Sequence, residues 1–284
     1  MSKKNWLYEI TPKNSLLDIN FKEVWAYRDL LILFVKRDVI TVYKQTILGP
    51  LWYLIQPLFT SIIFTIVFNK IANIPTNGVP PFLFNLAGIT AWNYFKDCLI
   101  ATSDTFKKNQ AIFGKVYFPR IIMPLSIVIS NLLKFGIQLA IFFGFYFYYV
   151  FNGMSLDISL NILYLPILII SMGLLGLGLG MVISSMVTKY RDLTFLVSFG
   201  VQLLMYLSAV VYPIELMRET MKDYAWIVEY NPMTTIIVTF RNLMLNTGVV
   251  LIEDILYMMG ISFTIFILGM LVFNKTEKSF IDTI

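Results

Sequence analysis

The chain has 284 residues, and its composition is typical of a membrane protein. Apolar residues make up 58% and charged residues 14%, against about half and about a quarter in soluble domains. The mean hydropathy is +0.74. A soluble domain of this length cannot bury so much apolar surface, so the composition excludes that class and predicts a lipid environment. Histidine is absent and Cys98 is the one cysteine, which excludes histidine triads, histidine-ligated metals and internal disulfides. We therefore expect no catalytic or metal site. The N-terminal stretch MSKKNWLYEITPKNS is polar, so we also expect no signal peptide.

Charge spacing divides the chain into spans. Six intervals of 20 or more residues lack Asp, Glu, Lys and Arg: 45–69, 71–95, 135–156, 158–188, 193–214 and 255–274. A helix needs about 20 apolar residues to cross a hydrocarbon core of about 30 Å. We therefore predict an all-α integral membrane protein with six transmembrane helices, at 50–70, 82–103, 121–150, 161–187, 193–213 and 253–274. The predicted divisions are a cytoplasmic segment 1–44, a transmembrane domain 45–274 and a cytoplasmic tail 275–284.

The net charge of +5 comes from Lys and Arg residues that gather on one side of these spans. They lie before the first span, in the 104–120 connection, in the 188–192 turn and after residue 274, whereas loops 72–81 and 152–161 have none. The positive-inside rule then predicts that both termini are cytoplasmic. We interpret the charge as a topology signal and expect no nucleic-acid partner.

Residues 19–44 are predicted to form an amphipathic helix before the membrane. Apolar residues recur at spacings of three and four, at Phe21, Val24, Leu31, Ile32, Val35, Val39 and Val42. Lys22, Asp29, Lys36, Arg37 and Lys44 gather on the other side. One interpretation places this helix along the inner interface with its basic groups on anionic headgroups. The other has it docked on protein.

Glycines in the fourth predicted span indicate close helix packing. The stretch 173–180 reads GLLGLGLG, in which Gly176 and Gly180 have small-xxx-small spacing. A phosphate-binding loop would need a Lys followed by Ser or Thr, and hydrophobic residues follow instead. The chain has no Walker A sequence, so an ATP-driven process would need an ATPase on another chain.

Aromatic and polar residues inside the spans are candidates for a transport path. Trp52 and Phe59 are seven residues apart, so they share a helix face that can stack on sugar rings. Gln56 and Gln202 are amides at membrane depth that need a partner or water. Packing against lipid or a neighbouring helix remains an alternative. Lys134 lies well inside the third span, so it either faces a cavity or partner, or 121–133 lies shallow.

The charged connection at 104–118 and the turn at 188–192 are both predicted to be cytoplasmic. A short helix in the first, rich in aromatic and basic residues, is a candidate contact for a cytoplasmic partner. The turn is a candidate second contact. Each is equally compatible with an ordinary solvated loop.

Several motifs together resemble the permeases of type-2 ABC exporters for polysaccharides and polyol phosphates. They are residues 42–57, VYKQTILGPLWYLIQP, then Tyr190-Arg191-Asp192, Val211-Tyr212-Pro213 and Tyr230-Asn231-Pro232-Met233, in that order. The tail from Glu277 to Asp282 is also similar. The resemblance covers nearly the whole chain. Permeases of O-antigen exporters are the most similar.

The resemblance implies an architecture and partners. Such permeases are homodimers of six-span subunits in the bacterial inner membrane, paired with two copies of a separate ATPase that binds ATP and Mg. This chain would then hold no cofactor and catalyse no reaction. It would have an N-terminal interfacial helix, a cytoplasmic coupling helix and short external re-entrant gate helices. The implied cargo is a lipid-linked polysaccharide, which crosses through a channel at the dimer centre.

The resemblance also assigns residues. The expected channel-lining residues are Trp52, Tyr53, Gln56, Phe59, Gln202 and Tyr206. The expected ATPase-coupling residues are Phe106, Lys107, Lys108, Phe113, Lys115, Tyr117, Arg191 and Asp192. The expected external-gate residues are Tyr212, Pro213, Asn231 and Pro232. The alternatives are export of teichoic acid, capsule or a small molecule, an ion-driven secondary transporter, and a membrane-embedded transferase.

Overall fold

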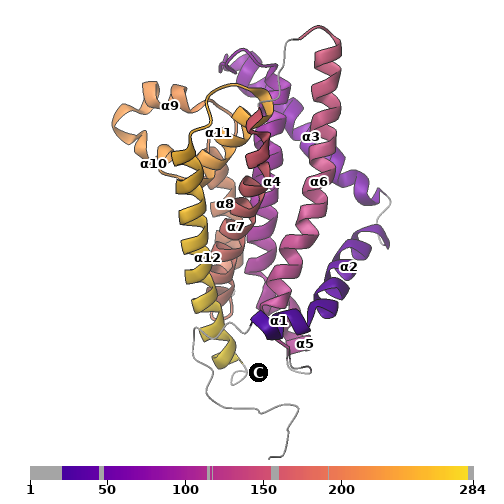
Figure 1. The fold of residues 1–284 in the computed structure, drawn as a ribbon. Helices are drawn as coiled ribbons and strands as arrows, with labels where there is room; N and C mark the ends of the chain where they lie inside the picture. The colour runs from indigo at the N-terminus through magenta and orange to yellow at the C-terminus, as the bar shows by residue number, and fades with distance from the viewer. Residues whose placement is uncertain are drawn as a thin grey trace, which may run out of the picture.

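The computed structural model describes residues 21–44, 48–113, 116, 118–154, 160–190 and 192–280, and every regular element in these ranges is a helix. Figure 1 shows a bundle of long helices with α9, α10 and α11 at one end and α1 and α5 at the other. Residues 1–20, Lys115, Tyr117 and Arg191 lie outside the described residues. The expected all-α fold is confirmed for the described ranges.

The N-terminal segment is two helices rather than the single one predicted. The helices are α1 (Phe21–Ala26) and α2 (Arg28–Lys44), with a break at Tyr27. Helix α2 packs against α6 and buries Phe34 there. Ile32, which the sequence placed on the apolar face, is exposed, as is Leu33. The helix therefore packs one side on protein and leaves further apolar residues uncovered, and its placement along the membrane interface stays a prediction.

Four helical stretches are long and apolar enough to cross a membrane. They are Gly49–Ile71, Ile122–Phe151, Asn161–Val187 and Ile252–Glu277. The first consists of η1 (Gly49–Leu51), α3 (Trp52–Phe64) and η2 (Thr65–Ile71). The others contain α6 (Ile122–Phe151), η3 (Leu160–Tyr164) with α7 (Leu165–Val187), and α12 (Ile252–Phe280). These four match the predicted first, third, fourth and sixth spans.

Helices α4 (Pro81–Ser103) and α8 (Leu193–Tyr206) occupy the other two predicted spans. Helix α4 has 23 residues and lies in the middle of the bundle (Figure 1), in contact with α3, α6, α7 and α11. It is covered mainly by protein and therefore needs less apolar surface than a lipid-exposed helix. Helix α8 has 14 residues, or about 21 Å at 1.5 Å per residue, which is less than a bilayer core.

The predicted fifth span to residue 213 is therefore too long, because α8 ends at Tyr206. Beyond it the chain turns, with Ala209 in the left-handed region at φ 50°. The turn leads to α9 (Ile214–Met221), η4 (Lys222–Tyr224), α10 (Trp226–Glu229) and α11 (Pro232–Leu245). The chain between α8 and α12 therefore consists of short helices, and their role as re-entrant gate helices stays a prediction.

Glycines on α7 allow the central helices to approach closely. An ideal Cβ on Gly176 would lie 2.9 Å from the Cβ of Cys98, and one on Gly180 would lie 2.6 Å from the Cβ of Thr102. Both neighbours belong to α4. A Cβ on Gly178 would lie 2.7 Å from the backbone carbonyl carbon of Ile265 on α12. The predicted small-residue packing is confirmed, and it brings α7 against two helices at once.

An apolar cluster, which we call the α5 cluster, forms at the end of the bundle that the sequence predicts to be cytoplasmic. It joins α2, α5 (Thr105–Phe113), the start of α6, the second half of α7 and the end of α12. Its buried residues are Phe34, Phe106, Phe113, Phe118, Ile122, Met123, Leu177, Met181, Met270 and Phe273. The cluster fixes α5 against the bundle, so this connection is not a free loop.

Candidate functional site

One side of α3 carries exposed aromatic rings with an amide between them. Trp52 is 51% exposed and Phe59 is 63% exposed, and Gln56 lies between them on the same helix face. Pro57 and Ser61 on the opposite side are buried. The structure therefore brings three of the predicted channel residues onto one uncovered surface.

Tyr53 was expected with these residues but lies elsewhere on α3. The Lys134 Nζ of α6 lies 5.2 Å from the centroid of its ring. Tyr53 is only partly exposed and belongs to the side of α3 on which Pro57 is buried. A single α3 helix cannot present Tyr53 and Trp52 to the same space, since adjacent residues are about 100° apart.

Helix α8 carries an exposed face with the same chemistry. Its members are Phe195, Phe199, Gln202 and Tyr206, at successive spacings of four, three and four. Phe195 is 82% exposed and Phe199 is 60% exposed. The prediction included Gln202 and Tyr206 but missed both phenylalanines. The spacing that links Trp52, Gln56 and Phe59 repeats here and would have found them.

We call these two surfaces the α3 face and the α8 face. Both helices pack on α4. Aromatic rings give large contact area with few rotatable bonds, and amide groups donate and accept hydrogen bonds. The combination suits a cargo with alternating C–H and hydroxyl surfaces, such as a sugar chain. In the described part of the chain, no group of three or more His, Cys, Asp or Glu residues is placed to hold a metal ion.

Helix α5 separates its aromatic residues from its basic ones. The Phe106 ring stacks on Phe273 of α12, with centroids 4.5 Å apart, and Phe113 is also buried. Lys107 and Lys108 are exposed on the other side. Of the coupling residues that the structure describes on α5, the phenylalanines therefore anchor the helix within this chain and the lysines face outward. Asp192, from the second predicted contact, is exposed just before α8.

Arg120 joins the start of α6 to the end of α12. Its Nε lies 3.6 Å from the Glu277 Oε1, and its Nη1 donates to the Glu277 carbonyl oxygen at 3.3 Å. The guanidinium also lies 5.0 Å from the Phe113 ring centroid. Burial lowers the pKa of Arg120 and the Glu277 carboxylate opposes that shift, so the group stays charged. This contact adds an ionic link to the α5 cluster.

The predicted external-gate residues meet where α8 ends. Asn231 caps α11 by accepting from the Met233 backbone N–H at 3.0 Å. Its Nδ2 donates to the Leu207 carbonyl at 3.0 Å and to the Ser208 Oγ at 2.9 Å. Pro232 is the first residue of α11, where its missing N–H costs nothing. These two residues thus attach α11 to the end of α8.

Tyr212 and Pro213 lie at the other end of the same turn. The Tyr212 hydroxyl donates to the Tyr206 carbonyl oxygen, and Tyr212 and Pro213 are both buried. Pro213 immediately precedes α9. The four predicted gate residues therefore lie at one joint between α8, α9 and α11, and Tyr212 and Asn231 supply hydrogen bonds to it.

Arg241 of α11 fills the centre of this joint, and the sequence analysis gave it no role. It is buried and donates to the carbonyl oxygens of Ala209 at 2.7 Å and of Val210. It also donates to the Phe84 carbonyl oxygen of α4 at 3.2 Å, and its guanidinium lies 3.7 Å from the Phe84 ring centroid. One side chain thus supplies donors to turn carbonyls that no helix can satisfy. No local sequence pattern predicts this, because Arg241 follows Ala209 by 32 residues.

Comparison with known proteins supplies a family. The ABC-2 type transporter family matches residues 29–245. An O-antigen export system permease protein RfbA of Klebsiella pneumoniae is 30% identical over 258 residues, covering 89% of this chain and 94% of that protein. A second Klebsiella pneumoniae protein of the same name is 29% identical over 256 residues, with 89% and 94% covered. A Myxococcus xanthus protein of the same name is 20% identical over 265 residues, with 93% and 98% covered.

Proposed function

The chain belongs to the ABC-2 type transporter family, and from this premise we propose that it is the permease subunit of an ATP-driven polysaccharide exporter. Two copies would form the membrane-spanning part, and two copies of a separate ABC ATPase would bind ATP and Mg on the cytoplasmic side. The cargo would be a lipid-linked polysaccharide of the O-antigen type. The relatives' names support this cargo, since they are O-antigen export permeases that align along most of both chains.

The observation that carries the proposal is the pair of uncovered aromatic faces. Within one chain, only 11% of the residues in the most apolar stretch of Gly49–Ile71 are buried. An aromatic surface with an exposed amide is poorly suited to lipid alone, whereas both features serve a path for a hydrated sugar chain. In a dimer, the α3 and α8 faces of two copies would enclose such a path. Weak contacts repeated along it would allow a polymer to move without being trapped.

The remaining helices would complete the transporter. Helices α4 and α8 would provide the second and fifth of six spans, so that both termini are cytoplasmic. Helix α8 is too short to cross alone, and the joint with α9 and α11 would continue its path as re-entrant gate helices. Tyr224, Trp226 and Tyr230 are exposed there, which fits residence at a membrane interface.

The α5 cluster would carry the coupling to ATP hydrolysis. Lys107 and Lys108 on the outer side of α5 would contact the ATPase, and Asp192 would belong to the second contact. Phe106 and Phe113 would transmit movement of α5, because they pack directly on α12 and on Phe118. The chain itself would change no covalent bond.

A deletion in the encoding organism tests the function. Removing this chain should eliminate surface polysaccharide while lipid-linked polysaccharide accumulates inside, and the wild-type chain should restore export. A double Ala variant at Trp52 and Phe59, present in the membrane at wild-type level, should restore it only weakly. If the deletion leaves surface polysaccharide unchanged and a small molecule or teichoic acid accumulates inside the cell, that compound would be the cargo instead. Export that persists without any ABC ATPase would contradict the proposal as a whole.

A further inference from the structure

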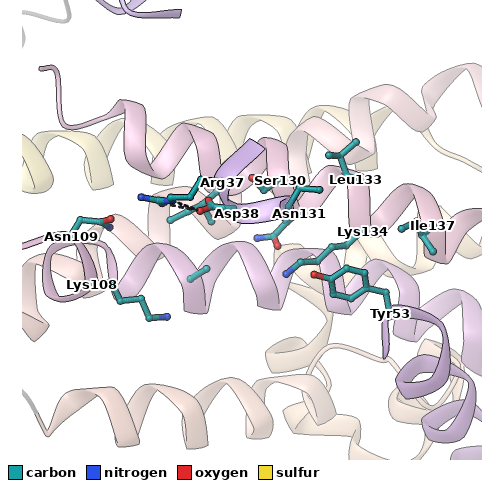
Figure 2. A pocket seen from close by; sticks show the side chains of 13 residues that line it. Arg37, Asp38, Tyr53, Lys108, Asn109, Ser130, Asn131, Leu133, Lys134 and Ile137 are labelled. Carbon is teal, nitrogen blue, oxygen red and sulfur yellow. Dashed lines mark hydrogen bonds and ion pairs between the residues drawn. The ribbon is translucent and has the colours of Figure 1, made fainter. Parts of the chain in front are cut away.

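A cavity of about 410 Å³ lies between α2, α4, α5, α6 and the first turn of α3. It is separate from the α3 and α8 faces, since Tyr53 is the one residue of α3 that lines it. Figure 2 shows the Arg37–Asp38 pair in one part of the cavity and Lys134 beside Tyr53 in another. Three basic side chains, Arg37, Lys108 and Lys134, and one acidic side chain, Asp38, line it.

Two of the three cations already have carboxylate partners. The Arg37 Nη2 lies 2.8 Å from the Asp38 Oδ1, and the Lys108 Nζ lies 3.1 Å from the Asp104 Oδ2. No ion pair joins Lys134 to a carboxylate of the residues that the structure describes. Lys134 contacts the Tyr53 ring instead, with its Nζ 5.2 Å from the ring centroid, and that ring carries no charge. Lys134 therefore suits a bound anion.

The depth of Lys134 identifies where that anion would come from. Tyr53 is the second residue of α3, and Ala101, which also lines the cavity, is near the end of α4. Lys134 is therefore level with two helix ends that the topology places on the cytoplasmic side. Helix α6 has 30 residues, or about 45 Å, so its first part extends beyond the core. From Lys134 to Phe151 the helix covers about 27 Å, close to one bilayer core. Of the two sequence alternatives for Lys134, this placement favours a shallow segment before it.

We propose that this cavity binds the phosphate of an anionic phospholipid from the inner leaflet. Lys134 contacts the phosphate, and the amides of Asn131 and Asn109 are placed to bond to headgroup hydroxyls. The Asn131 Nδ2 is directed to the Cys98 sulfur at 3.9 Å, which leaves its carbonyl oxygen for a ligand. Ile127, Leu133 and Ile137 line the apolar part, where the upper acyl chain lies. The lipid would bridge α2, α3 and α6.

Retention of lipid by the purified chain tests this site without any transport. In native mass spectrometry from detergent, the wild type should keep phosphatidylglycerol about tenfold better than phosphatidylcholine, which corresponds to about 1.4 kcal/mol. Lys134→Met should remove most of that preference, Lys134→Arg should retain it, and Lys70→Met, an exposed lysine at the other end of the first span, should behave as wild type. Equal retention of the two lipids by the wild type, or an unchanged preference in Lys134→Met, would overturn the proposal.

Two further measurements identify the source of the phosphate. Both use the wild-type chain, so they do not depend on whether the variants fold. Inorganic phosphate or glycerol phosphate should not displace the retained lipid, and efficient displacement would assign the site to a soluble anion instead. In the wild-type chain, phosphatidylglycerol with a photoreactive headgroup should label α2 and residues 127–137. Labelling confined to other helices would contradict the site. Either failure leaves the proposed export function untouched, because no arm measures export.

Discussion

The Phe106 ring of α5 stacks on the Phe273 ring of α12, with centroids 4.5 Å apart and ring planes at 25°. Both side chains are fully buried. Helix α12 packs along α7, and α7 packs along α4. The short helix α5 is therefore attached by a specific aromatic contact to the central helices of the bundle, on which α3 and α8 also pack.

Replacing Phe106 tests this attachment. Phe106→Ala removes a buried ring and leaves a cavity, so we expect the free energy of unfolding to fall by about 3–5 kcal/mol. Thermal unfolding of the detergent-purified chain measures this. Gln110→Ala on the exposed side of the same helix should change little. A loss of stability as large in Gln110→Ala would show that α5 is held by contacts other than this stack.

Charge reversal on the outer side of α5 tests the coupling role. We expect Lys107→Glu with Lys108→Glu to leave the chain folded in the membrane while separating ATP hydrolysis from export, because exposed charges set orientation at contacts more than fold stability. ATPase activity and polysaccharide export are measured together in the reconstituted complex. Lys36→Glu, at an exposed lysine of α2, is the control and should leave export coupled to ATP hydrolysis. Wild-type export in the Lys107 and Lys108 double variant would argue against the assignment.

The sequence predicts the order and location of the helices well. A helix that crosses lipid needs about 20 consecutive residues without charge, and such intervals are visible in the sequence. It does not predict that Phe106 and Phe113 turn inward. A helix of nine residues shows one apolar side whether it packs on its own chain or on a partner. The direction of that side depends on α12, which lies about 160 residues further along the chain.

The early end of α8 was missed for a related reason. Residues 207–213 are apolar enough to continue a span, and their carbonyls accept hydrogen bonds from Asn231 and Arg241, which lie more than 20 residues further along the chain. The α8 face was half-predicted because Gln202 and Tyr206 are conspicuous in an apolar segment, whereas Phe195 and Phe199 look like ordinary lipid-facing residues. They become candidates for the same path only when their spacing is compared with that of the α3 face.

Export should depend on the aromatic rings of both faces. Trp52→Ala with Phe59→Ala, and separately Phe195→Ala with Phe199→Ala, should each slow polysaccharide export several-fold, since each lost stacking contact weakens the path by about 1 kcal/mol. The rate at which new polysaccharide reaches the surface measures this. Phe151→Ala is a matched control, because Phe151 is highly exposed but lies at the end of α6. If the control slows export equally, the rings act through lipid contact.

Arg241 should be a main source of stability for the joint between α8, α9 and α11. Arg241→Met keeps most of the volume but leaves the Ala209 and Val210 carbonyls without donors. Hydrogen bonds from charged groups are worth about 1.5–3 kcal/mol each, so we expect a loss of about 3 kcal/mol or more in thermal unfolding. Arg218→Met removes an exposed ion pair with Glu229 and should cost less than about 1 kcal/mol. Similar losses for the two variants would contradict a special role for Arg241.

Two glycine substitutions should have effects of opposite sign. Gly180→Ala places a Cβ about 2.6 Å from the Thr102 Cβ, so α4 and α7 must separate, and we expect a destabilisation of about 1–3 kcal/mol. Gly260→Ala on α12 meets no atom within 4 Å and should stabilise the helix by up to about 1 kcal/mol.

Thermal unfolding of each purified variant measures the difference, and a double variant tests the cause. Thr102→Gly removes the side chain that the new Cβ meets, so it should be less damaging in the Gly180→Ala background than in the wild type. That inequality is the coupling expected of two residues in direct contact. Strictly additive effects would mean that the new Cβ is opposed by the α4 backbone, where the Leu99 carbonyl oxygen lies 2.9 Å from it, rather than by the Thr102 side chain.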